Sequence, residues 1–204
     1  YSDTIAKYTV RFFNEGTQIG SDQEVEHGQA AVLPANPTKT ADAEYTYTFE
    51  KWVDNAGLDV NLNNITSNTD AYAQYTKVKN KYTVTFYDED KTAVLDTKTV
   101  EYGTAVTIEN PTKQATAQYT YTFEKWLDKA TDGEVDLSNV LANMEVYAKY
   151  TQTVNKYTVT FYDEDGTSKL GESTVEYGTN AVYPNSLPTK ASTDGHTYAF
   201  DKWV

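Results

Sequence analysis

The stretch KYTVTFYDED occupies residues 81–90 and recurs unchanged at 156–165, and KYTVRFFNEG stands at the matching residues 7–16. Apolar and polar side chains alternate along the stretch, with Val84 and Phe86 on one face and threonines on the other. Such alternation predicts a β-strand with one buried face, and the polar residues after it predict a turn into a second strand. The stretch therefore predicts a β-hairpin at the start of each copy.

Further landmarks follow each copy of this stretch in a fixed order. They are a glycine at Gly28, Gly103 and Gly178, a PTK triplet starting at Pro37, Pro111 and Pro188, and a tryptophan at Trp52, Trp126 and Trp203. Each tryptophan lies 15 residues after its proline, and the lysines that begin the copies, Lys7, Lys81 and Lys156, are 74 and then 75 residues apart. This period is too long for ankyrin or tetratricopeptide units and is long enough for a small domain. The sequence therefore predicts small domains in tandem.

The landmarks also divide the chain. We expect residues 7–75, 81–150 and 156–204 to form repeats 1, 2 and 3, with linkers at 76–80 and 151–155 and the end of a preceding copy at 1–6. Repeat 3 stops one residue after Trp203, so we expect it to be truncated at its C-terminal end. The linkers have neither glycine nor proline, which predicts restricted bending and contacts between neighbouring repeats. Each repeat is expected to add roughly 30 to 35 Å to a semi-rigid rod.

Within repeat 2, further strands are predicted at residues 95–102, 119–126 and 146–151. One short helix is predicted in each repeat, at the position of either 112–118 or 138–143 in repeat 2. The predicted fold class is therefore α+β and β-dominated, a mainly antiparallel sheet with at most one short helix. Because a domain of about 70 residues needs its largest side chains for its core, four residues of repeat 2 and their equivalents are expected there: Val84, Phe86, Phe123 and Trp126.

Composition excludes several classes of protein. The 204 residues carry 17 Lys plus Arg against 30 Asp plus Glu, a net charge of −13 that disfavours nucleic acid as a partner. Cysteine is absent, which excludes a disulfide scaffold and thiolate metal sites, and no segment is apolar enough to span a membrane. The two histidines, His27 and His196, stand at different places in their repeats and form no recurring pair. We expect no enzyme activity and no cofactor.

The repeated motifs resemble a known family. YTVTFYDEDGT, VEYG, PTK, an aromatic strand ending F-x-x-W and a closing VYAKY are similar to the internalin B-repeat, also called the Listeria–Bacteroides repeat. The resemblance implies β-grasp-like modules that occur in tandem in cell-surface proteins, largely of Gram-positive bacteria. Repeat 1 departs from the pattern by one deleted residue in its hairpin turn and by His27 in place of tyrosine.

Two functions remain open at this point. The resemblance implies an extracellular stalk on the bacterial cell wall that carries a distal binding domain. Alternatively the repeats act as an adhesin and bind host glycan or extracellular-matrix protein by avidity. Outward aromatic and basic side chains are the candidate contact surface: Tyr87, Tyr121, Tyr162 and Lys113.

Two kinds of chemical site are weaker alternatives. The acidic turns at 88–90 and 163–165 offer oxygen ligands for calcium, but they lack the spacing of an EF-hand loop. Intramolecular isopeptide bonds from Lys to Asn or Asp stiffen some surface proteins of this kind, and Lys81 and Lys156 recur at one position, but no sequence signature supports such a bond. We therefore predict solvated hairpin turns and no metal site.

Overall fold

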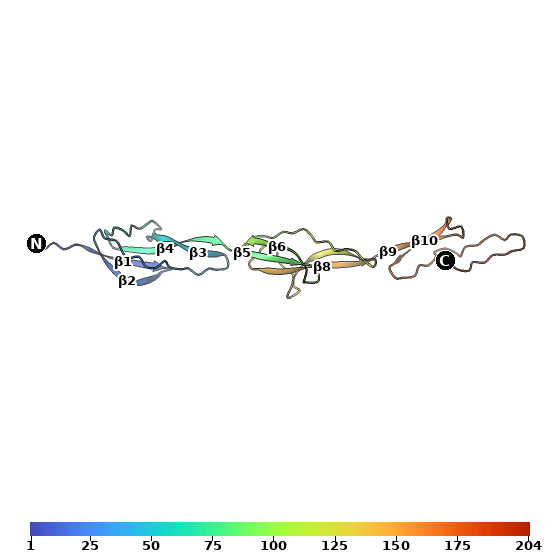
Figure 1. Cartoon of the computed structure of the whole chain (residues 1–204), viewed down its shortest axis with the longest axis horizontal. Coiled ribbons are helices and arrows are strands. Elements are labelled where there is room, and N and C mark those ends of the chain that lie inside the picture. Colours follow the sequence, from blue (N-terminus) through green and yellow to red (C-terminus); the bar gives the residue numbers. More distant parts are fainter. The chain divides into compact units, whose positions relative to one another are not determined.

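The computed structural model describes residues 1–204 and consists of strands joined by turns and loops. The strands are β1 (Lys7–Asn14), β2 (Thr17–Glu26), β3 (Tyr45–Val53), β4 (Thr69–Lys79), β5 (Lys81–Tyr87), β6 (Val94–Glu101), β7 (Tyr119–Asp128), β8 (Met144–Val154), β9 (Lys156–Tyr162) and β10 (Lys169–Glu176). They form two four-stranded sheets, in the orders β2-β1-β4-β3 and β6-β5-β8-β7, and one two-stranded sheet, β10-β9 (Figure 1). The sheets match the three repeats in order along the chain.

The chain divides into two compact units. One consists of residues 1–85, 96–107 and 136–145, and the other of residues 86–95, 108–135 and 146–204. The first unit holds the whole sheet of repeat 1, and the second holds the whole sheet of repeat 3.

The sheet of repeat 1 combines antiparallel and parallel pairs. Strands β1 and β2 form the predicted antiparallel hairpin, whose turn has positive φ at Glu15 (48°) and Gly16 (81°). Strand β4 lies parallel to β1, with Phe12 opposite Ala71, and antiparallel to β3. A parallel partner cannot be reached by a tight turn. The parallel strands β1 and β4 are therefore joined by a long connection that includes β2 and β3.

The core forms where the alternating apolar faces meet. Val10 (0% exposed) and Phe12 (2%) are buried together with Trp52, whose ring lies 4.9 Å from that of Phe12. The same edge-to-face contact joins Phe86 and Trp126 in repeat 2, also at 4.9 Å. This arrangement places the ring edge of one aromatic residue against the face of another. The predicted core is confirmed for Val84, Phe86 and Trp126, which are buried, whereas Phe123 is half-buried.

The helix predicted in each repeat is wrong, and with it the α part of the α+β class. Residues 112–118 form a loop in which the carbonyl groups of Thr116 and Ala117 accept hydrogen bonds from Asn155. Residues 138–143 contain turns, and Val140 pairs with Thr104 as an isolated β-bridge. Distant partners thus take up the backbone groups that helical hydrogen bonds would use. No helix long and apolar enough for a membrane crossing occurs in the structure.

The closing strands are longer than the sequence predicts. Strand β8 runs from Met144 to Val154 and pairs with β7 over nearly its whole length. Four of the five residues assigned to each linker, 76–79 and 151–154, therefore lie in strands β4 and β8. A single residue, Asn80 or Asn155, separates each closing strand from the first strand of the next repeat.

Repeat 3 has a sheet of two strands. Strand β9 pairs antiparallel with β10, with Val159 opposite Ser173, and residues 177–204 contain no further strand. Val159 is 37% exposed, whereas the equivalent Val10 and Val84 are 0% exposed. The difference follows because β1 lies beside a closing strand and β9 lacks one.

Candidate functional site

The lysine of each PTK triplet belongs to a cluster that recurs in all three repeats, which we call the hairpin lysine cluster. In each repeat it comprises this lysine, a glutamate of the first hairpin turn and a tyrosine of the strand or segment that leads to the tryptophan. The members are Lys39, Glu15 and Tyr47; Lys113, Glu89 and Tyr121; and Lys190, Glu164 and Tyr198. The cluster therefore links three parts of the repeat that are separate in sequence.

Its geometry is similar in each repeat. Lys39 Nζ lies 3.0 Å from Glu15 Oε1 and 4.6 Å from the centre of the Tyr47 ring. Lys190 forms an ion pair with Glu164 and lies 4.7 Å from the centre of the Tyr198 ring. A cation over an aromatic face is attracted by the negative charge of that face.

Repeat 2 adds a second ring to the cluster. Lys113 pairs with Glu89 and lies 4.3 Å from the centre of the Tyr121 ring and 5.8 Å from that of Tyr150. The hydrogen bond to Glu89 raises the pKa of Lys113 above its ordinary value, because it favours the charged ammonium. Burial raises the pKa of Tyr150 to about 12, with the nearby charge of Asp88 as the next cause. The cluster is thus a charged lysine held between a carboxylate and the rings of two tyrosines.

The predicted contact residues occupy different settings. Lys113 and Tyr121 are brought together in the hairpin lysine cluster. Tyr87 is half-buried and lies under Lys129, whose Nζ is 3.5 Å from the centre of its ring. Tyr162 is 46% exposed at the end of β9. These four residues remain a prediction as a surface for a partner.

The acidic turns use their carboxylates to hold the hairpin loops. Asp165 Oδ1 accepts hydrogen bonds from the backbone N–H groups of Thr167 (2.8 Å) and Ser168 (2.7 Å), and the Ser168 hydroxyl donates to Oδ2. The hydroxyl of Ser168 is the largest of the causes that lower the pKa of Asp165 to about 2, ahead of the backbone donors. Asp90 accepts from the N–H groups of Thr92 and Ala93 in the same way. Across the chain, histidine and carboxylate side chains do not gather in threes as a metal site requires.

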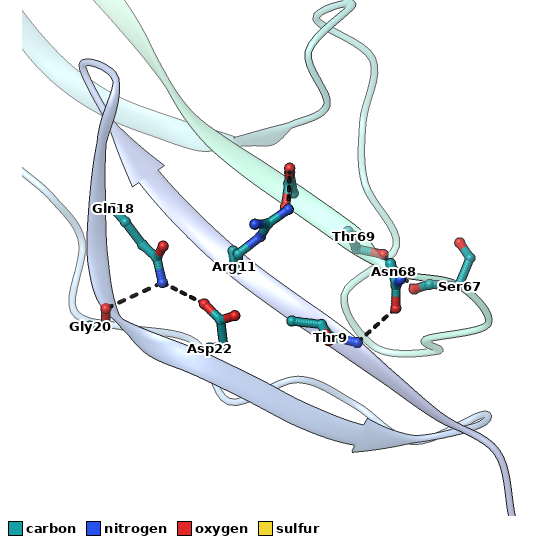
Figure 2. A network of polar contacts seen from close by, with 9 residues as sticks. Thr9, Arg11, Gln18, Gly20, Asp22, Ser67, Asn68 and Thr69 are labelled. Atoms are coloured by element: carbon teal, nitrogen blue, oxygen red, sulfur yellow. Dashed lines mark hydrogen bonds and ion pairs between the residues drawn. The ribbon is translucent and has the colours of Figure 1, made fainter.

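Repeat 1 carries a polar network that the sequence analysis missed (Figure 2). Arg11 on β1 donates to Asp70 on β4 from Nε (2.8 Å) and Nη2 (3.0 Å), a bidentate pair. Asn68 accepts from the Thr9 backbone N–H at 2.9 Å, just before β4 begins. The Asn68 contact recurs as Thr83 N–H to Asn143 Oδ1, also at 2.9 Å. The asparagine that recurs before each closing strand is the sequence signal that could have identified this backbone contact.

The two histidines have different local contacts. His27 donates its backbone N–H to Ala6, and its ring lies 5.9 Å from that of Tyr8. His196 forms a tight turn with Thr193. Each histidine therefore has a local structural setting of its own.

Repeat 3 contains an open apolar groove of about 600 Å³. Its lining includes Phe161, Leu170 and Trp203, and the rings of Phe161 and Trp203 lie 4.8 Å apart. Phe161 and Trp203 are equivalent to the buried phenylalanine and tryptophan of repeats 1 and 2. The groove is therefore the core face of a two-stranded sheet.

The family comparison finds a match in each of the three repeats. The model of the Listeria-Bacteroides repeat domain matches residues 8–74, 82–149 and 157–204. The chain belongs to this family of tandem repeats.

Two individual proteins are similar to the chain. A protein of Evansella cellulosilytica described as a putative Gly-rich membrane protein is 26% identical over 196 residues, which are 94% of this chain and 21% of that protein. The chain thus spans about a fifth of the length of this relative. Domains 3–4 of the Streptococcal High Identity Repeats in Tandem from a cell surface protein are 16% identical, with a TM-score of 0.34 over 73% of this chain and 99% of that one.

Proposed function

We propose that the chain is a non-enzymatic spacer region of a bacterial cell-surface protein, whose repeats hold a distal binding domain away from the cell wall. The proposal rests on the family, whose repeats stand in tandem here, and on the surface location implied by the family resemblance. We also propose that each complete repeat is β-grasp-like without its helix, because the sheet of repeat 1 is mixed with a parallel central pair and the sheet of repeat 2 has the same strand order.

One observation carries the proposal furthest. The side chains of the hairpin lysine cluster recur in every repeat and contact one another within the repeat itself. Lys39, Lys113 and Lys190 each hold a glutamate and a tyrosine of their own repeat. A side chain that serves the fold in this way explains its recurrence without a ligand.

The alternative is that the repeats themselves bind glycan or extracellular-matrix protein through weak sites that gain strength by repetition. The observation in its favour is the exposure of Tyr162 (46%) and Tyr198 (43%), since an exposed ring can stack on a sugar. Both residues belong to repeat 3, which has the two-stranded sheet.

A binding screen of the whole chain separates the two functions. The chain and its Tyr162→Ala variant are tested against panels of host glycans and matrix proteins by surface plasmon resonance. A spacer gives no saturable response for either protein, and its maximum dimension in small-angle X-ray scattering is consistent with about 30 Å per repeat. Saturable binding that Tyr162→Ala weakens would overturn the spacer proposal in favour of the adhesin.

A further inference from the structure

Asn80 and Asn155 occupy the same position in the repeated sequence, as the first residue of N-K-Y-T-V. Asn80 is the one residue between β4 and β5, and Asn155 is the one residue between β8 and β9. Both are half-buried, although each stands at the point where two repeats join. We call them the junction asparagines.

Asn80 binds the turn that precedes β3 in repeat 1. Its side-chain Nδ2 donates to the carbonyl oxygens of Asp42 (2.8 Å) and Ala43 (3.1 Å), and its Oδ1 accepts from the Thr46 hydroxyl (2.8 Å). Its backbone N–H donates to the carbonyl of Glu44 at 2.8 Å. The carboxamide thus uses two donors and one acceptor on a single turn of the preceding repeat.

The same residue also contacts the following repeat. Its carbonyl oxygen accepts from the backbone N–H of Tyr102 at 2.9 Å, just after β6. Tyr82, two residues further on, donates its hydroxyl to the carbonyl of Ala43 at 2.7 Å and packs against Tyr102 with ring centres 6.2 Å apart. Hydrogen bonds of Asn80 and Tyr82 therefore join the turn of repeat 1 to the first hairpin of repeat 2.

The second junction repeats this arrangement. Asn155 Nδ2 donates to the carbonyls of Thr116 (2.8 Å) and Ala117 (3.0 Å), and Oδ1 accepts from Thr120 at 2.7 Å. Its backbone N–H donates to Gln118, and its carbonyl accepts from Tyr177. Tyr157 also takes the role of Tyr82: its hydroxyl donates to Ala117, and its ring lies 6.2 Å from that of Tyr177.

The start of repeat 1 shows which of these contacts the repeat needs for its own fold. Ala6 stands where the junction asparagines stand, and its carbonyl still accepts from the backbone N–H of His27 at 2.8 Å. The Tyr8 and His27 rings also remain paired. An alanine is thus compatible with a folded first hairpin, and the contacts that it lacks are those of the carboxamide.

We infer that each junction asparagine, together with the tyrosine two residues later, forms a docking surface whose partner is the 42–46 or 116–120 turn of the preceding repeat. The surface joins consecutive repeats of this chain and limits bending at residues 80 and 155. Asparagine suits the position because it supplies both donors and an acceptor on a short side chain, whereas aspartate supplies no donor. The inference goes beyond the proposed function, because it holds for spacer and adhesin alike.

The test compares amide hydrogen exchange in the full chain and in its Asn80→Ala variant, with Asn55→Ala as the matched control at an exposed loop asparagine. The amide at position 80, which bonds to the preceding repeat, is expected to exchange at least tenfold faster in Asn80→Ala. The Tyr102 amide is expected to keep its protection, because the equivalent amide of His27 bonds to the carbonyl of Ala6, a residue without a carboxamide. The control leaves both amides unchanged.

A second variant keeps the test decisive if Asn80→Ala perturbs repeat 2. Tyr82→Phe removes one hydrogen bond and keeps the ring, and we expect it to speed exchange at position 80 by a smaller factor. In both variants, ¹⁵N relaxation is expected to give shorter rotational correlation times for β1 and β5 than in the unmodified chain. Unchanged exchange and relaxation in both variants would overturn the inference, as would equal loss of protection at position 80 and Tyr102.

Discussion

Single residues of the hairpin lysine cluster are predicted to contribute little to stability compared with the core. Lys113→Met removes an exposed ion pair and a cation–π contact, and we expect it to lower the free energy of opening of repeat 2 by about 0.5–1.5 kcal/mol. Trp126→Ala opens a cavity beside Phe86 and is expected to cost about 3–5 kcal/mol. Hydrogen exchange at the buried Val84 and Val146 measures both values. Equal effects of the two variants would show that the cluster is more than a surface contact.

The carboxylate of Asp165 makes the stability of the hairpin turn in repeat 3 depend on pH. Its hydrogen bonds lower its pKa to about 2 in the folded chain, against about 3.9 for an unfolded aspartate. The stabilisation is therefore fully present above about pH 4 and is lost as the pH falls through about 2. Carboxyl ¹³C chemical shifts are expected to titrate with a midpoint near 2 for Asp165. A midpoint near 3.9 would mean that the turn hydrogen bonds do not form in solution.

Among the elements, strands were predictable from sequence and the connecting segments were not. Alternation in residues 81–88 identifies β5, because the side chains that decide it lie next to one another in sequence. The segment 112–118 is one of the two positions at which the sequence predicts a helix, but its carbonyls accept hydrogen bonds from Asn155 and Tyr157, about 40 residues away. The hairpin lysine cluster also joins residues that are distant in sequence. The sequence shows that its lysine, glutamate and tyrosine recur, but it does not show that they contact one another.

The pairing of β9 predicts that repeat 3 opens more readily than the others. The amides of β9 are expected to exchange faster than the equivalent amides of β1, because β1 lies between two strands and β9 pairs with β10 alone. Appending residues 128–154 of repeat 2 after Val204 supplies the sequence of a closing strand. We expect this extended chain to slow exchange at Val159 and to bury it. Equal protection of β1 and β9 in the original chain would contradict the prediction.

At the scale of the whole molecule, the junction asparagines make neighbouring repeats depend on each other. In linear arrays, stability is approximately the sum of a term for each repeat and a term for each interface. The interface at Asn155 places the turn 116–120 of repeat 2 in contact with the start of repeat 3. A defect inside repeat 2 should therefore weaken repeat 3 through this turn.

A double-mutant cycle on Trp126 and Asn155 measures this dependence. Trp126→Ala loosens repeat 2 and with it the 116–120 turn, so the free energy of opening of β9 should fall in the chain with Asn155 intact. With Asn155→Ala the contact is already lost, and Trp126→Ala should then have a smaller further effect on β9. The difference, an interaction energy of about 0.5–3 kcal/mol for residues that share a contact network, is obtained from amide exchange in β9. The same effect of Trp126→Ala in both backgrounds would show that the repeats are independent, because the cycle would then close with no interaction energy.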